Sequence, residues 1–110
     1  AWAFEEPPTE PNFITHRRVM APVAVIDRGD APEGAIAVVS SADPGYDWLF
    51  SRGVVGLVTA YGGCNSHMAV RSIQLGIPAV IGAGDERFGR WSQATFLDVD
   101  CANRLVRIVT

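Results

Sequence analysis

Residues 54–81 read V-V-G-L-V-T-A-Y-G-G-C-N-S-H-M-A-V-R-S-I-Q-L-G-I-P-A-V-I. The apolar run at 54–59 predicts a buried strand, and the glycine pair at 62–63 breaks the chain after it. A helix is predicted from Ser66, a favoured N-cap, to residue 75, with Gly76 as its stop. Residues 79–81 predict another strand. This strand–helix–strand order is typical of an α/β domain.

The sequence on either side predicts further elements of the same kind. Asp43 is a favoured N-cap and Pro44 a favoured first helical residue, so a short helix is expected there, with Gly53 as its stop. A helical turn is expected at 86–88. The other predicted strands are 19–26, 35–39, 95–99 and 105–109, of which the last two form a hairpin.

Together these elements predict an α/β domain with a largely parallel or mixed central sheet. Pro22 falls inside the predicted strand 19–26. Because proline has no N–H to donate to a ladder, it is expected at a sheet edge or a bulge.

The length of 110 residues predicts one domain, and 48% hydrophobic residues are enough for a single core. Residues 1–18 contain Pro7, Pro8 and Pro11 among glutamates, which predicts an extended, solvated linker. The globular domain proper is therefore expected at 19–110. A linker of this kind suggests that the chain belongs to a longer polypeptide.

Composition excludes several classes of function. The net charge of −3 offers no electrostatic footprint for nucleic acid. No apolar run approaches the length of about 20 residues that a membrane span needs. The first residues lack the features of a secretory signal, so a cytoplasmic location is expected. All nine basic residues are arginines, which excludes a lysine nucleophile or Schiff base within this chain.

No metal site is expected in this chain. A zinc site needs three or four ligands, and beyond Cys64 and His67, which have a C-x-x-H spacing, only Cys101 and His16 remain as soft candidates. Both cysteines are expected to be free thiols. The aspartates that could form a carboxylate pair have no fixed spacing on one element and are interpreted as caps and strand-end residues: Asp43, Asp47, Asp98 and Asp100.

The strongest functional candidate is His67, in the first turn of the predicted helix. That end carries about half a positive charge and several N–H groups without helical partners, so it suits a phosphoryl group on the imidazole. Arg71 and Gln74 share a polar stripe with His67, and Arg71 leans back toward it. The opposing stripe, formed by Ala69, Val70 and Ile73, is expected to be buried. The residues alone leave open that His67 is a structural cap residue and Arg71 a solvated charge.

Residues 62–82, G-G-C-N-S-H-M-A-V-R-S-I-Q-L-G-I-P-A-V-I-G, resemble the signature of the mobile domain of phosphoenolpyruvate-utilising enzymes. That family includes phosphoenolpyruvate synthase, pyruvate phosphate dikinase and the first enzyme of the sugar phosphotransferase system. The glycine pair, Ser66-His67, Ala69 and the block at 75–80 match in register. The resemblance implies a swivelling β/β/α domain in which His67 is phosphorylated, supported by the loop residues Gly62, Gly63, Asn65 and Ser66.

The resemblance also implies partners. In those enzymes the domain carries the phosphoryl group between an ATP-grasp domain and a phosphoenolpyruvate/pyruvate barrel that needs Mg²⁺. No cofactor is expected within this chain; Mg²⁺ and ATP or phosphoenolpyruvate are expected in the partner domains. An isolated domain is then expected to turn over nothing. The alternative is a non-catalytic swivelling module used for docking or regulation.

Two positions depart from the family pattern. Asn65 stands where a threonine is frequent, so a hydrogen-bonding role can survive there but hydroxyl phosphorylation cannot. The family's Ala-Arg pair falls on Ser72-Ile73, so its usual arginine is absent. Arg71, one turn after His67, is the candidate substitute.

Overall fold

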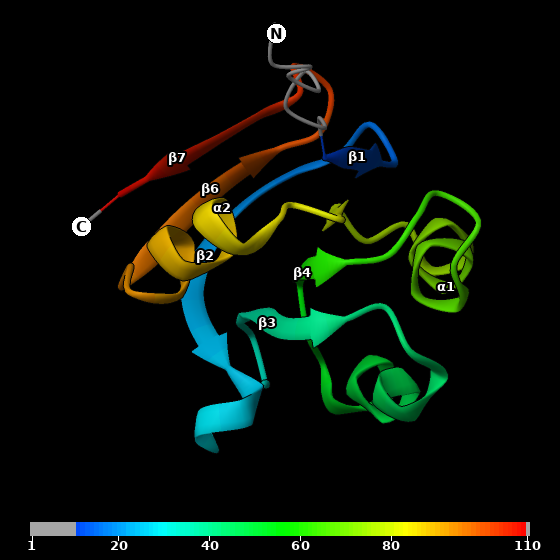
Figure 1. Cartoon of the computed structure of the whole chain (residues 1–110), viewed down its shortest axis with the longest axis horizontal. Helices are drawn as coiled ribbons and strands as arrows, with labels where there is room; N and C mark the ends of the chain where they lie inside the picture. The colour runs from blue at the N-terminus through cyan, green and yellow to red at the C-terminus, as the bar shows by residue number, and fades with distance from the viewer. Residues whose placement is uncertain (1–10, 110) are drawn as a thin grey trace, which may run out of the picture.

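The computed structural model of the chain describes residues 11–109. They form a seven-stranded mixed sheet with helices on both faces (Figure 1). The strands are β1 (Asn12–Ile14), β2 (Arg18–Val25), β3 (Ile36–Ser41), β4 (Gly56–Tyr61), β5 (Ala79–Ile81), β6 (Phe96–Asp100) and β7 (Leu105–Ile108). The helices are the 3-10 helices η1 (Ile26–Arg28) and η2 (Pro44–Arg52) and the α-helices α1 (His67–Leu75) and α2 (Asp85–Ser92).

The middle of the sheet is parallel and its flanks are antiparallel. The strand order is β1-β5-β4-β3-β2-β6-β7, and the neighbours from β5 to β2 all run parallel. β1 pairs antiparallel with β5, β6 pairs antiparallel with β2, and β6 and β7 form the predicted hairpin. The prediction of an α/β fold with a mixed sheet is confirmed.

Pro22 does not lie on an edge strand. It is the last residue of β2 that pairs with β6, and from Val23 onward β2 pairs with β3. A residue without an N–H is tolerated there because the strand changes partner at this point.

Two apolar layers sandwich the parallel strands. On β3, Ala37 and Val39 face one layer and Ile36 and Val38 face the other, as strand alternation requires. The first layer includes residues of α1 and η2, and the second includes Trp91 of α2. α1 and η2 therefore cover one face of the sheet and α2 covers the other.

The predicted linker is wrong for residues 12–18. Asn12–Ile14 form β1, which pairs with β5, and Ile14 is buried. Arg18 begins β2 and pairs with Asp98. The segment before residue 12 is rich in proline and charge, so the local sequence does not indicate β1. This three-residue edge strand is stabilised by its pairing with β5. The first ten residues of the predicted linker lie outside the described residues.

The predicted buried stripe of α1 is partly wrong. Ala69 is buried as expected, but Val70 is 45% exposed and Ile73 is 59% exposed. The helix instead buries Met68, Ala69 and Ser72. Ser72 can lie in the core because its hydroxyl donates to the Met68 carbonyl at 2.8 Å. Hydrophobicity alone favours the stripe that contains Val70 and Ile73. It does not predict that the Ser72 hydroxyl finds an acceptor within the helix.

Two glycines allow the ends of β4 and β5 to meet. At Gly82, with φ +77°, an added Cβ would lie 2.5 Å from the Gly62 carbonyl oxygen. At Gly62, with φ +130°, it would lie 2.6 Å from the Ala42 side chain. The buried Thr59 hydroxyl ties the two ends together, accepting from the Gly82 N–H at 3.1 Å and donating to the Tyr61 carbonyl at 2.9 Å. This contact sets where the loop toward α1 begins.

We expect Gly82→Ala to lower the free energy of unfolding by about 2–4 kcal/mol, because the methyl group meets backbone at a left-handed φ. Urea denaturation followed by circular dichroism measures the change. Gly63→Ala is the matched control, since a Cβ there meets nothing within 4 Å. Its effect should stay within about 0.5 kcal/mol, and equal losses in both variants would contradict the packing argument.

Candidate functional site

The start of α1 follows the carboxyl end of β4 across the five-residue loop 62–66. Ser66 is the N-cap, with extended backbone, and its hydroxyl accepts from the Ala69 N–H at 3.4 Å. The Ser66 carbonyl accepts from the Val70 N–H at 3.1 Å. The prediction that Ser66 caps this helix is confirmed. Two first-turn donors, the N–H groups of His67 and Met68, find no acceptor within residues 11–109.

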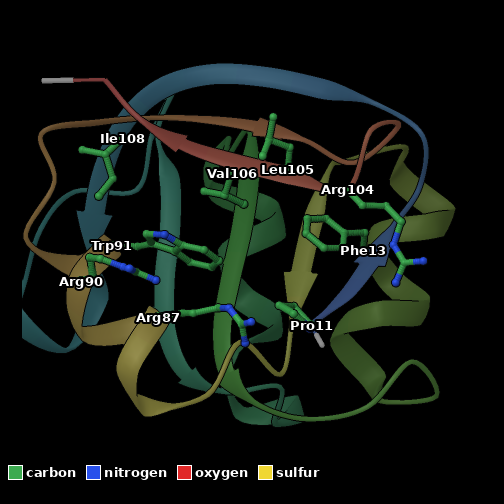
Figure 2. Close-up of a pocket in the computed structure, with 9 residues that line it drawn as sticks. All are labelled: Pro11, Phe13, Arg87, Arg90, Trp91, Arg104, Leu105, Val106 and Ile108. Carbon is green, nitrogen blue, oxygen red and sulfur yellow. The ribbon is translucent and has the colours of Figure 1, made fainter. Parts of the chain in front are cut away.

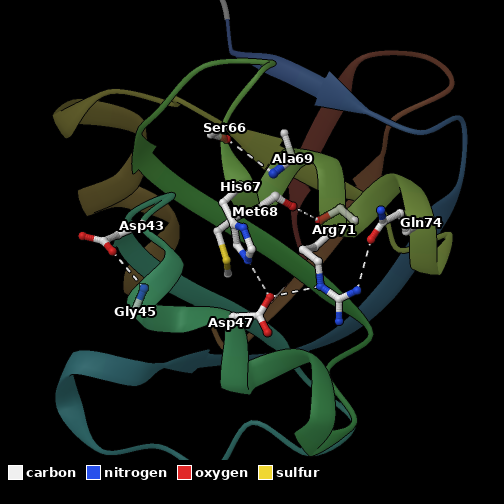
Figure 3. Close-up of polar contacts among 10 residues, drawn as sticks. Asp43, Gly45, Asp47, Ser66, His67, Met68, Ala69, Arg71 and Gln74 are labelled. Carbon is white, nitrogen blue, oxygen red and sulfur yellow. Dashed lines mark hydrogen bonds and ion pairs between the residues drawn. The ribbon is translucent and has the colours of Figure 1, made fainter.

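His67 lies on the open surface at this helix start. Its side chain is 40% exposed, so its ring is not enclosed by apolar neighbours. Its Nε2 atom lies 2.7 Å from Oδ1 of Asp47, a residue of η2 (Figure 3). His67 is therefore an accessible histidine beyond the carboxyl end of β4.

Arg71 approaches the same carboxylate. Its Nε donates to Oδ1 of Asp47 at 3.0 Å, and its Nη1 donates to Gln74 at 3.1 Å. Its guanidinium also lies over the Phe50 ring, 5.7 Å from the centroid. The polar stripe of His67, Arg71 and Gln74 is therefore present, as Figure 3 shows. Arg71 reaches His67 through Asp47, however, and not directly.

Asp47 is the residue that the sequence interpretation missed. It was expected to be a cap or strand-end residue, yet one of its oxygens joins His67 to Arg71. These contacts lower the pKa of the Asp47 carboxyl; the His67 hydrogen bond is the largest cause, and Arg71 adds to it. The sequence signal that could have located Asp47 is the helix cap at Asp43, whose carboxylate accepts a hydrogen bond from the Gly45 N–H at 2.8 Å. That cap fixes the start of η2 and hence the face on which Asp47 lies.

Asp100 is a strand-end residue as expected, but Asp98 is not, because it lies in the middle of β6. Asp98 forms two hydrogen bonds with Arg18, of 2.9 and 2.6 Å, and this pairing lowers the pKa of its carboxyl. Asp100 accepts from the side chain and the backbone of Asn103. Neither side chain contacts His67 among the described residues, so Asp47 is the carboxylate of the site.

The loop before the helix differs in part from its expected role. Gly62 approaches Ala42 and Gly82 closely, so its positive φ serves packing between strand ends. Gly63 has open space around it, and Asn65 is exposed. Gly63 and Asn65 therefore leave the approach to the helix start unobstructed.

Between residues 11 and 109, no group of three or more histidine, cysteine or acidic side chains is arranged to hold a metal ion. Cys64 is exposed and Cys101 is buried, and both are free thiols. Burial raises the pKa of Cys101 to about 11, which keeps it protonated at neutral pH. None of the helices in this same range is long and apolar enough to cross a membrane.

A separate hollow of about 600 Å³ lies between α2 and β7 (Figure 2). Its walls combine aromatic residues with arginines, including Phe13, Trp91 and Arg90. α2 covers the sheet face opposite α1. The hollow therefore contains none of the residues around His67.

Known proteins resemble this chain in sequence and in structure. The family described as "PEP-utilising enzyme, mobile domain" matches residues 31–104. A probable phosphoenolpyruvate synthase of Staphylothermus marinus is 43% identical over 54 residues, which are 48% of this chain and 6% of that protein. A phosphoenolpyruvate-protein phosphotransferase of Haloferax volcanii is 34% identical over 70 residues, 63% of this chain and 12% of that protein. The chain thus matches a small part of each relative.

A solved structure shares the fold. The solution structure of a UPF0107 protein superimposes with a TM-score of 0.71, covering 93% of this chain and 98% of that one. The sequence identity is 14%, so this similarity concerns the fold alone.

We expect the Asp47 carboxyl to titrate below its ordinary value of about 3.9. A lowered pKa contributes stability above the unfolded-state value, and that contribution disappears as the pH falls through the folded-state pKa. His67→Ala and Arg71→Ala should each raise the pKa of Asp47, because each removes a partner of the charged form. Carboxyl carbon NMR titration measures it. Asp30, whose pKa is lowered by Arg28, is the internal control and should not move.

Proposed function

This chain belongs to the family of PEP-utilising enzyme mobile domains, and we propose that it is a phosphoryl carrier in which His67 is transiently phosphorylated. One observation carries the proposal. An exposed histidine stands in the first turn of a capped helix, at the position where the sequence resembles the family's Ser-His signature. By the same resemblance, we propose that the α/β fold is the swivelling domain of that family.

The chemistry follows from the surroundings of His67. A lone pair of its imidazole attacks the phosphorus, a nitrogen–phosphorus bond forms, and the bond to the donor oxygen breaks with its electrons. The reverse step passes the group to the acceptor. The free N–H groups of the first helical turn stabilise the added negative charge, as helix N-termini do for anions. Arg71, one turn further along, supplies a full positive charge within reach.

Other domains must supply the donor and the acceptor. The relatives are far longer than the segments that match, which supports a parent protein with further domains. We propose that the phosphoryl group is carried between an ATP-grasp domain and a phosphoenolpyruvate/pyruvate barrel domain, which bind Mg²⁺ and ATP or phosphoenolpyruvate. In this proposal the isolated chain has no catalytic turnover of its own. We also propose that the protein is cytoplasmic.

The accessibility of His67 favours this function over a docking or regulatory module. A module kept only for docking has no need of an exposed imidazole next to unpaired helix N–H groups and an arginine. A carrier needs all three, because its histidine has to enter two active sites in turn.

We expect His67 to be the phosphorylated residue. Incubating the parent protein with radiolabelled ATP or phosphoenolpyruvate, followed by peptide mapping, should place acid-labile label on the peptide that contains it. His67→Ala should abolish the label, while Cys64→Ala, three residues away and exposed, should retain it. Acid-stable label, or label that persists in His67→Ala, would refute the assignment.

Arg71 should accelerate that step. Arg71→Ala removes one charge-assisted contact to the phosphoryl group, worth about 1.5–3 kcal/mol, so phosphorylation should slow by roughly tenfold to a hundredfold. Rapid-quench labelling of the parent protein gives the rate. Arg90→Ala, on the opposite face of the sheet, is the matched loss of charge and should leave the rate unchanged. If both variants match the wild type, Arg71 is a surface charge only.

A further inference from the structure

We propose that Asp47 is a displaceable partner of His67. Its carboxylate is hydrogen-bonded to Nε2 of the unphosphorylated ring. This hydrogen bond has to break before Nε2 accepts a phosphoryl group. This inference rests on the proposed phosphorylation of His67 and assigns a role to a residue of η2, an element outside the sequence signature at 62–82.

The contact and the modification exclude each other at Nε2. Oδ1 of Asp47 lies 2.7 Å from this nitrogen, at hydrogen-bond distance. A covalent bond to phosphorus is shorter than that, so a phosphoryl group on Nε2 would take the place of the carboxylate oxygen. The two groups would also repel each other, since both are negatively charged.

The proton on the ring leads to the same conclusion. An ionised carboxylate can only accept a hydrogen bond, so Nε2 carries a proton while it is bound to Asp47. A protonated ring nitrogen has no lone pair for attack on phosphorus. The ring must first release this proton to water and hold one on Nδ1 instead, an exchange that solvent can mediate because the side chain is 40% exposed.

Displacement of Asp47 would release Arg71 at the same moment. The Nε of Arg71 donates to the same Oδ1 at 3.0 Å, and loses that acceptor when the carboxylate leaves. Its contacts with Gln74 and with the Phe50 ring do not involve Asp47 and can hold it in place. Arg71 would then exchange a carboxylate for a phosphoryl group without leaving the start of α1.

The structure of η2 is compatible with such a displacement. It is a 3-10 helix of nine residues, longer than this geometry usually sustains, because its hydrogen bonds are poorer than those of an α-helix. The Asp47 side chain is 42% exposed and its neighbour Trp48 is 45% exposed. Neither side chain is locked into the core, so the carboxylate can rotate away at low cost.

The first test uses the 110-residue chain and phosphoramidate, a small donor that needs no partner domain. Phosphorus NMR follows the formation of phosphohistidine. Asp47→Ala should react faster than the wild type by about threefold to tenfold, because a partly exposed ionic contact no longer competes for Nε2. Glu86→Ala, the matched loss of an exposed carboxylate on α2, should react like the wild type. An equal or slower rate in Asp47→Ala would overturn the proposal.

Nitrogen NMR of the unphosphorylated ring gives a second readout. The wild type should hold its proton mainly on Nε2, and Asp47→Ala should shift the population toward Nδ1; identical tautomers in both would overturn the proposal. Failure of the proposed function looks different. The parent protein would then leave His67 unlabelled with ATP and with phosphoenolpyruvate, while phosphoramidate would still separate Asp47→Ala from the wild type.

Discussion

Four parallel strands bury side chains on both of their faces, and the remaining structure follows from that constraint. Each parallel connection needs a crossover, and the crossovers from β3 to β4 and from β4 to β5 bring η2 and α1 to one face. α2, in the connection from β5 to the antiparallel strand β6, covers the other face. η2 follows β3 and α1 follows β4. Because β3 and β4 are neighbours in the sheet, the two helices lie side by side on the same face. The contact between Asp47 and His67 is a consequence of this arrangement.

The electrostatics of the site depend on one shared oxygen atom. Oδ1 of Asp47 accepts from Arg71 and contacts Nε2 of His67, so the arginine charge is partly neutralised while the histidine is unmodified. In the proposed carrier, a phosphoryl group on His67 would offer Arg71 a more highly charged partner in place of the Asp47 carboxylate.

The surroundings of the loop explain how an exposed histidine is held at the edge of the sheet. Thr59, Gly62 and Gly82 join the ends of β4 and β5 through buried backbone contacts. The residues from Tyr61 to Asn65, which lead from this junction to the N-cap of α1, are all exposed. The helix start is therefore held by the sheet on one side and open to solvent on the other.

The sequence by itself determined the α/β class, the cap at Ser66, the position of His67 and the family resemblance, because each depends on residues that are close together in the chain. The tertiary structure alone decided that Asn12–Ile14 form a strand, since a segment so short is stable only beside β5. It also decided which stripe of α1 is buried: Ser72 lies in the core, where its hydroxyl is satisfied by the Met68 carbonyl, while Val70 and Ile73 stay exposed. Asp47 lies 20 residues before His67, and no local pattern links them; only the packing of η2 against α1 brings the carboxylate to the imidazole.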